Sequence, residues 1–301
     1  MRAIRDALLV ASFDLFESVR SRKFLALLVL HVLGAVVSTL VFVKILAEFE
    51  TVLATQLGVA ETAKPGTMTE ELMNSPETLE VLTGLMQDAE LAKELVSVPP
   101  LALFYGWIAL FVLPALVVFT SSDAISAELS SGSARFALFR TQRLSWAVGK
   151  LGGQACLLFI MVFLGAIAVW IVGALSLAGF DGPGTAWWLA RLGLRAFVYG
   201  FAFLGLALGI SQMTRSVNGA RAFGLIALIA VGVLASLSMW DEAIEYAPVL
   251  IPTLQPMFPG THKLTLWQPD LAARGPSMAM LLALGFFYFG IGHAVMVRRD
   301  A

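Results

Sequence analysis

The chain has 301 residues, of which 58% are hydrophobic and 14% charged. Soluble domains are about 45–50% apolar and about 25% charged, so this composition excludes an ordinary soluble domain and indicates a membrane protein. The chain carries 20 Lys and Arg against 21 Asp and Glu, and this balance gives no basic excess for binding nucleic acid.

The first predicted element is an amphipathic helix over residues 2–20. Apolar residues recur there at helical spacing, at Ile4, Leu8, Ala11, Leu15 and Val19, and the charges fall largely on the other face. Because Asp14 and Glu17 would be costly inside lipid, the favoured prediction is a helix in the headgroup plane. The alternative is an extension of the first span.

Six stretches without any charged residue follow, each about 19 residues or longer, which is enough for a helix to cross ~30 Å of hydrocarbon. They predict an all-α integral membrane protein with a single transmembrane domain over 1–301. The predicted spans are 24–43, 100–121, 151–175, 194–214, 219–240 and 277–297, of which the fourth and fifth extend past the charge-free stretch to include Arg195 and Arg221 near their starts.

Between the first two spans, residues 44–98 form the longest predicted loop, with ten acidic residues and three lysines. Ser75-Pro76-Glu77 is a typical helix start, with an N-cap serine, proline at the first helical position and an acid in the first turn. Leucines at helical spacing follow, and Pro65-Gly66 predicts a turn before them. The segment is therefore predicted to be a helical cap outside the cell membrane.

Residues 122–150 join spans two and three and mix charges with apolar residues. Ser130-Ser131-Gly132-Ser133 is predicted to break the segment into two short helical stretches. Such a bent helix pair is unusual for a mere connector and favours docking on a partner.

Six prolines lie within 241–276, the loop before the last span. Irregular apolar backbone beside a membrane is tolerated where protein buries it or where it lines a cavity. Residues 246–267 therefore either dip into the outer leaflet as broken helices or lie extended on the surface.

Orientation follows from the distribution of Lys and Arg, which favour the cytoplasmic side. With both termini in the cytoplasm, 13 of the 20 fall inside: Arg2, Arg5, Arg20, Arg22, Lys23, Arg135, Arg140, Arg143, Lys150, Arg215, Arg221, Arg298 and Arg299. Of the 21 acidic residues, 15 fall outside.

The sequence offers no catalytic, cofactor or metal motif. HExxH, the P-loop and Gly-x-Ser-x-Gly are all absent, and the spans hold no Asp, Glu or Lys away from their ends. That absence disfavours an enzyme, an ion-coupled transporter and an intramembrane protease. His31 and His293 lie near the same ends of their spans, but two histidines make a weak site, and no metal is predicted.

Four further features are interpreted structurally. Gly205 and Gly209 form one GxxxG pair and Gly149 and Gly153 another, which predicts close helix approaches. Arg195 is expected to snorkel to the outer interface beside tryptophans. The single cysteine, Cys156, excludes an internal disulfide and is expected to be buried.

Residues 124–150, AISAELSSGSARFALFRTQRLSWAVGK, resemble the cytoplasmic segment of ABC-2-type permeases, the membrane subunits of a class of ABC exporters. The matching residues are Glu128, Gly132-Ser133, Leu138, Arg143 and Gly149-Lys150. The chain departs from the family pattern at Thr141-Gln142, where a proline usually precedes the arginine. The long loop over 44–98 is similar to that of permeases grouped with copper-enzyme maturation exporters.

This resemblance implies a subunit of the bacterial inner membrane that is driven by a separate ATPase subunit, which binds the ATP. A second permease copy, identical or related, would complete the pathway. The 122–150 loop would be the coupling element, with Glu128, Gly132, Arg135, Arg140 and Arg143 at the contact. An alternative is a non-transporting component through which the ATPase drives an extracytoplasmic partner at 44–98.

Overall fold

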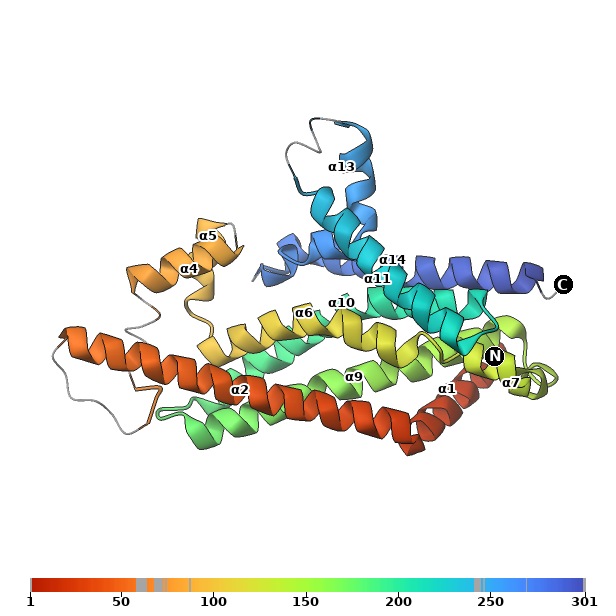
Figure 1. Cartoon of the computed structure of the whole chain (residues 1–301), viewed down its shortest axis with the longest axis horizontal. Helices are drawn as coiled ribbons and strands as arrows, with labels where there is room; N and C mark the ends of the chain where they lie inside the picture. Colours follow the sequence, from red (N-terminus) through yellow and green to blue (C-terminus); the bar gives the residue numbers. More distant parts are fainter. Residues whose placement is uncertain are drawn as a thin grey trace.

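The computed structural model describes residues 2–57, 64–67, 73, 75–86, 88–240, 245, 247–268 and 270–299. These residues form a bundle of long helices and contain no strand (Figure 1). Six helices are long and apolar enough to cross a membrane, which confirms the predicted all-α multi-pass fold. They are α2 (Arg22–Leu57), α6 (Pro100–Ser121), α9 (Arg143–Ser176), α10 (Gly182–Met213), α11 (Val217–Leu237) and α14 (Leu271–Arg299). Both chain termini lie at one end of the bundle, called the terminal end below.

Several helices extend well beyond the stretches that lack charge. The longest, α2 and α9, have 36 and 34 residues, so each is about 50 Å long, against about 30 Å of hydrocarbon. Residues 143–150, taken from sequence as part of the connecting loop, form the first two turns of α9. The connection between α6 and α9 is therefore shorter than predicted. It holds α7 (Ser126–Ser131) and α8 (Ser133–Leu138), separated by Gly132 in the left-handed conformation at φ +77°.

The core of the bundle is α10, which packs against α14, α6 and α9. Glycines let α10 and α14 approach backbone to backbone. A β-carbon added at Gly205 would lie 1.9 Å from the carbonyl oxygen of Gly285, and one at Gly209 would lie 2.4 Å from that of Tyr288. The GxxxG pair of this helix therefore marks a close helix–helix contact, as expected from sequence.

The first helix, α1 (Arg2–Arg20), is separate from α2, because the chain breaks at Ser21 and the two helices meet at an angle (Figure 1). It packs against the first half of α9. Bulky apolar residues on its outer side stay exposed, with Leu8 at 65% and Phe16 at 67%. The helix is thus a distinct element and not a continuation of the first span, and an apolar face is left to meet lipid.

The cap between α2 and α6 contains α4 (Pro76–Met86) and α5 (Ala89–Leu95). Ser75 Oγ accepts a hydrogen bond from the Thr78 amide at 3.2 Å, so the predicted helix start is confirmed. The turn at Pro65-Gly66 is present, although 58–63 and 68–72 lie outside the described residues. Gly66 has φ +105°, and its amide donates to the Glu50 carboxylate at 2.9 Å, which ties the turn to the end of α2.

The proline-rich segment before α14 folds back on the bundle. It contains α13 (Leu250–Leu254), η1 (Gln255–Met257), η2 (Pro259–His262) and η3 (Thr265–Trp267), and η2 and η3 contact α11 and α14. Leu266 and Trp267 are buried, at 1% and 2% exposure. Of the two alternatives raised from sequence for this segment, an extended surface loop is wrong, since its later part is buried in protein as broken helix.

Two single-residue expectations are also wrong. Arg195 does not snorkel: it is 4% exposed, and its Nη1 donates to the carbonyl oxygens of Leu266 and Trp267 at 3.0 and 3.4 Å. The side chain fastens the folded-back segment, a role that sequence spacing does not reveal. Cys156 is exposed on the surface of α9, because the helix turns that position away from the bundle.

Candidate functional site

A buried ion-pair cluster joins α1, α7 and α9 at the terminal end. Its centre is Lys150, the eighth residue of α9, whose side chain is 4% exposed. Lys150 Nζ lies 2.5 Å from Asp14 Oδ1 on α1 and also donates to Glu128 Oε1 on α7. Gln154, one turn further along α9, donates to Asp14 Oδ2 at 2.9 Å. We call these four residues the Lys150 cluster. Because an unpaired buried charge is costly, the cluster holds three helices in one arrangement.

Glycines of α9 bring Asp14 close enough to reach Lys150. A β-carbon added at Gly149 would lie 2.6 Å from Val10 Cβ, and one at Gly153 would lie 2.6 Å from Asp14 Oδ2. The second GxxxG pair therefore forms the surface on which α1 rests. Sequence analysis predicted a close approach here but did not identify α1 as the partner helix.

A second cluster is centred on Asp123, in the turn after α6. Its Oδ1 lies 2.6 Å from Lys23 Nζ at the start of α2, and its Oδ2 accepts from Arg221 Nε at 3.0 Å and Nη2 at 2.5 Å. The carboxylate side chain is 10% exposed, whereas the two cations are 41% and 49% exposed. These three residues, the Asp123 cluster, join the ends of α2, α6 and α11.

The start of α7 is also fixed to the centre of the bundle. Ser211 Oγ, near the end of α10, accepts from the backbone amides of Ile125 and Ser126 at 3.1 and 2.9 Å. Ser211 is fully buried. With Glu128 bonded to Lys150, the short helix α7 is therefore attached to both α9 and α10 within a few residues.

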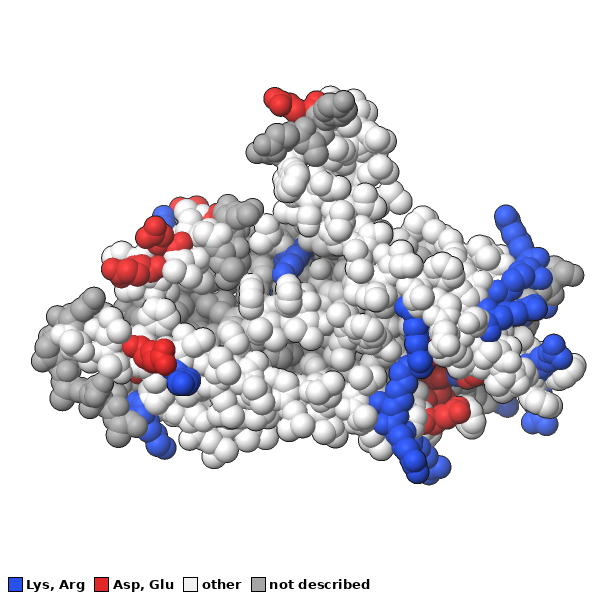
Figure 2. Space-filling view, viewed as in Figure 1, with Lys and Arg blue, Asp and Glu red and all other residues white. Residues whose placement is uncertain are grey.

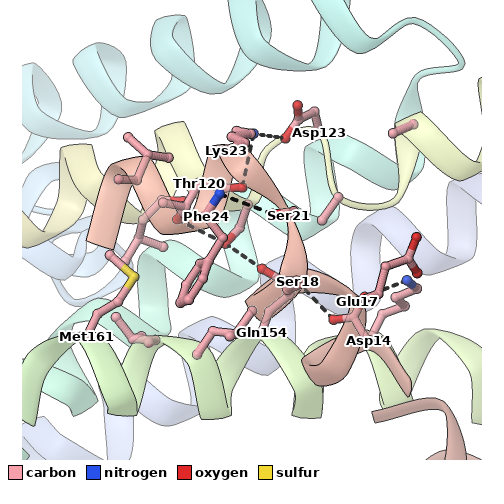
Figure 3. Close-up of a pocket in the computed structure, with 18 of the residues that line it drawn as sticks. Asp14, Glu17, Ser18, Ser21, Lys23, Phe24, Thr120, Asp123, Gln154 and Met161 are labelled. Atoms are coloured by element: carbon pink, nitrogen blue, oxygen red, sulfur yellow. Dashed lines mark hydrogen bonds and ion pairs between the residues drawn. The ribbon is translucent and has the colours of Figure 1, made fainter. Parts of the chain in front are cut away.

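Between the two clusters lies a polar cavity of about 260 Å³ (Figure 3). The junction of α1 and α2 forms one wall, and α6 and α9 form the other. Asp14, Glu17 and Lys23 contribute from the first wall, and Asp123 and Gln154 from the second. A polar cavity of this size accommodates water that hydrogen-bonds to the polar groups of both walls.

The structure separates the five residues expected at a partner contact. Glu128 points inward to Lys150, and Gly132 forms the turn between α7 and α8. Arg135, Arg140 and Arg143 are all exposed, but they line different cavities: Arg140 faces a groove beside α1, and the other two face a pocket on another side.

The two histidines considered as a shared metal site contact different helices. His31 of α2 lies against Gly165 of α9, and His293 Nδ1 of α14 lies 3.3 Å from Gln212 Oε1 of α10. Within the described ranges, no group of three or more His, Cys, Asp or Glu side chains is placed to hold a metal ion. That no metal binds in the spans stays a prediction.

Six helices long and apolar enough to cross a membrane define a multi-pass membrane protein. At its terminal end, one cluster of ion pairs connects α1 and α7 to α9, and another connects α2, the turn after α6 and α11. The model of the family described as ABC-2 family transporter protein matches residues 8–285, and the chain belongs to that family. It is therefore a permease component of an ABC transporter, a type of subunit that generally works with an ATPase subunit. A comparison with curated proteins gives no match.

Proposed function

We propose that the chain is the membrane subunit of an ABC exporter and that a separate ATPase subunit docks on α7 and α8. The observation that carries this proposal is the attachment of α7. Glu128 and the Ser211 hydrogen bonds fix it to α9 and α10, so force applied to α7 and α8 passes directly into two spanning helices. ATP would be bound by the partner, and the chain itself would hold no cofactor and bind no nucleic acid.

The charge distribution supports a cytoplasmic position for the terminal end. Figure 2 shows Lys and Arg gathered there, a mostly uncharged middle, and Asp and Glu prominent over the cap. Lys and Arg favour the cytoplasmic side of membrane proteins. We therefore place both termini and the α7–α8 segment in the cytoplasm of a bacterial cell and the cap outside its inner membrane.

The proposed docking face is the exposed side of α8. Phe136 and Phe139, at its end, are 75% and 86% exposed, and Arg140 follows them. Together with Leu9 and Phe13 of α1 they line a groove of about 960 Å³. Aromatic residues and arginine are the types that contribute most at protein interfaces, which favours an ATPase contact here.

Within the proposed contact we assign different roles to the predicted residues. Arg140 meets the ATPase, and Glu128 transmits the movement through Lys150. Gly132, Arg135 and Arg143 line another cavity and are left out of the contact. This assignment narrows the set expected from sequence.

A second permease copy, identical or related, belongs to the same proposal. Two spans, α2 and α11, have little of their surface covered within the chain, with 6% and 17% of their most apolar stretches buried. Lipid and a second copy are the two surroundings that suit such apolar faces.

A non-transporting component that drives an extracytoplasmic partner is the second candidate. The observation that favours it is the acidic cap, whose helices α4 and α5 pack on each other and project from the bundle (Figure 1). Substrate-stimulated ATP hydrolysis by the purified complex favours the transporter. If substrate does not stimulate hydrolysis, and the complex still needs the cap for its activity, the non-transporting component is favoured.

Replacing Phe139 or Arg140 with alanine is expected to weaken association with the ATPase subunit roughly tenfold or more, because each removes an exposed interface side chain. Thermal stability should not change, since neither residue is buried. Co-purification of the two subunits and the ATP hydrolysis rate of the complex would be measured. Glu128→Ala should instead lower coupling of hydrolysis to transport, with some loss of stability.

The matched control is Val249→Ala, an apolar residue that is 79% exposed and lies in the segment after α11. It should leave association unchanged. Full association in both the Phe139 and the Arg140 variants would contradict the docking proposal and leave membrane contact as the role of these side chains.

A further inference from the structure

The cavity between the Lys150 and Asp123 clusters has one polar end and one apolar end. On each of three helices, a polar residue nearer the terminal end is followed deeper in the bundle by an apolar one: Lys23 and Phe24 on α2, Thr120 and Val117 on α6, and Gln154 and Leu157 on α9. Figure 3 shows Asp14 and Glu17 on one side of the cavity and Phe24 and Met161 on the other.

This change from polar to apolar coincides with the expected edge of the hydrocarbon. The first charge-free stretch of the sequence begins at Phe24, directly after Lys23. A stretch of that kind marks the part of a helix that lies in hydrocarbon, and charged residues before it lie among the headgroups. The cavity therefore crosses the level at which the headgroups of the surrounding leaflet meet their acyl chains.

The two clusters beside the polar end carry opposite net charges. The Lys150 cluster contains two carboxylates and one lysine, which leaves a formal charge of −1. The Asp123 cluster contains one carboxylate with a lysine and an arginine, which leaves a formal charge of +1. Glu17 lines the same cavity and adds a negative charge beside Glu128 of the first cluster. A molecule at the polar end therefore meets negative charge on one side and positive charge on another.

Two side chains at the polar end have hydrogen-bonding capacity left for a ligand. The Glu17 carboxylate is exposed and has no hydrogen-bond or ion-pair partner among the described residues. Lys23 Nζ donates to Asp123 Oδ1 at 2.6 Å and to the carbonyl oxygen of Thr120 at 3.4 Å. An ammonium group has three donors, so one donor of Lys23 is still available. The cavity thus offers a free acceptor beside one cluster and a free donor within the other.

A zwitterionic amphiphile with a primary ammonium and a phosphate fits this arrangement. The ammonium would donate to the Glu17 carboxylate, and the phosphate would accept from Lys23, so both contacts are charge-assisted hydrogen bonds. Apolar side chains at the other end, including Leu27, Leu158 and Met161, suit the start of an acyl chain. Water or a small soluble zwitterion would leave that apolar surface wet, which is unfavourable. The cavity, at about 260 Å³, has room for a headgroup in place of water.

We propose that this cavity binds the headgroup of one phosphatidylethanolamine molecule, with its ammonium at Glu17 and its phosphate at Lys23. This inference goes beyond the proposed function, because it concerns the permease alone and requires no ATPase. The bound lipid would join the junction of α1 and α2 to α6 and α9, between the two ion-pair clusters. It would therefore hold α1 in place from the side opposite the groove beside α8.

The test compares two acidic residues of the same helix. Glu17 and Asp6 of α1 both line the groove beside α8, but Glu17 lines the cavity and Asp6 does not. Purified full-length protein would be placed in phosphatidylcholine nanodiscs that contain a minority of phosphatidylethanolamine. Lipid retained by the protein after transfer to detergent would be counted by native mass spectrometry.

Wild type is expected to retain one phosphatidylethanolamine in preference to phosphatidylcholine, whose trimethylammonium has no hydrogen to donate to Glu17. Glu17→Gln should weaken this retention roughly tenfold, which is the size of one hydrogen bond to a charged group. Asp6→Asn removes the same charge from the same helix and should behave as wild type. Because Glu17 is exposed, its variant should fold normally, which the melting temperature would check.

Three results would overturn the proposal: equal retention of the two lipids by wild type, equal retention in Glu17→Gln and Asp6→Asn, or equal thermal stabilisation of wild type by free phosphoethanolamine and by phosphatidylethanolamine. The last would assign the cavity to a soluble zwitterion. If Glu17→Gln does not fold, the comparison of the two lipids on wild type decides the question. Because no ATPase is present, failure here leaves the docking proposal standing.

Discussion

Lys150→Ala is expected to lower the free energy of unfolding by about 3–5 kcal/mol, because it leaves the buried Asp14 and the partly buried Glu128 without their cation. Unfolding would be followed in detergent by titration with sodium dodecyl sulfate. Burial raises the pKa of the Glu128 carboxyl. The folded variant therefore binds a proton at Glu128 more readily than the unfolded chain does, and part of the loss should be recovered as the pH falls into the mildly acidic range.

The control is the same substitution at Lys93, which forms an ion pair with Glu90 on the surface of the cap. Surface pairs contribute little, so Lys93→Ala should not change stability measurably. A second check replaces all three charges, with Asp14→Asn, Glu128→Gln and Lys150→Met, and should restore most of the stability. Equal stability of Lys150→Ala and wild type would contradict the buried cluster.

Gly205→Ala is expected to lower the free energy of unfolding by about 1–3 kcal/mol, because its added methyl group would meet the backbone of Gly285 at 1.9 Å. Backbone atoms cannot turn aside as a flexible side chain does, so α10 and α14 must separate. The measurement is the same denaturant titration, combined with the yield of folded protein.

Gly290→Ala, on α14, is the matched substitution, since nothing lies within 4 Å of the position its β-carbon would take. Alanine is the better helix former, so this variant should be unchanged or slightly more stable. If Gly205→Ala and Gly290→Ala behave alike, the close contact between α10 and α14 is wrong.

The two ion-pair clusters suggest how movement spreads from the docking face. The Lys150 cluster joins α1, α7 and α9, and the Asp123 cluster joins the ends of α2, α6 and α11. They lie on either side of the polar cavity in Figure 3. In the proposed function, a push on α7 moves α9 and α1 through the first cluster, while the second keeps the neighbouring helix ends together.

Much of the fold follows from local sequence. Runs without charge located all six spanning helices, and Ser75-Pro76 located the start of α4. Charge is a weaker guide to helix ends, because a helix that leaves the hydrocarbon continues through charged residues once water or protein solvates them. This is why α9 begins at Arg143 and not where its charge-free run begins.

The candidate site could be predicted only in part. Glu128 stood out because it matches a family pattern, yet its partner Lys150 is 22 residues away, and Asp14 is 136 residues from that lysine. Such pairings depend on which helices pack together, which no local pattern encodes. One usable signal was present: Lys150 lies within the Gly149–Gly153 pair, and an ionisable residue in a close-packing surface needs a charged partner on the facing helix. Arg195 was misplaced for a similar reason, because its acceptors are backbone carbonyl oxygens.

The most direct test of the proposed docking of the ATPase subunit on α7 and α8 is a crosslinking map of the assembled complex. A photoreactive amino acid would be placed at Phe139 on the proposed docking face or at Val249 in the segment after α11, both highly exposed. We expect adducts with the ATPase subunit from Phe139 and none from Val249. Adducts from Val249, or none from Phe139 in a complex that is otherwise assembled and active, would contradict it.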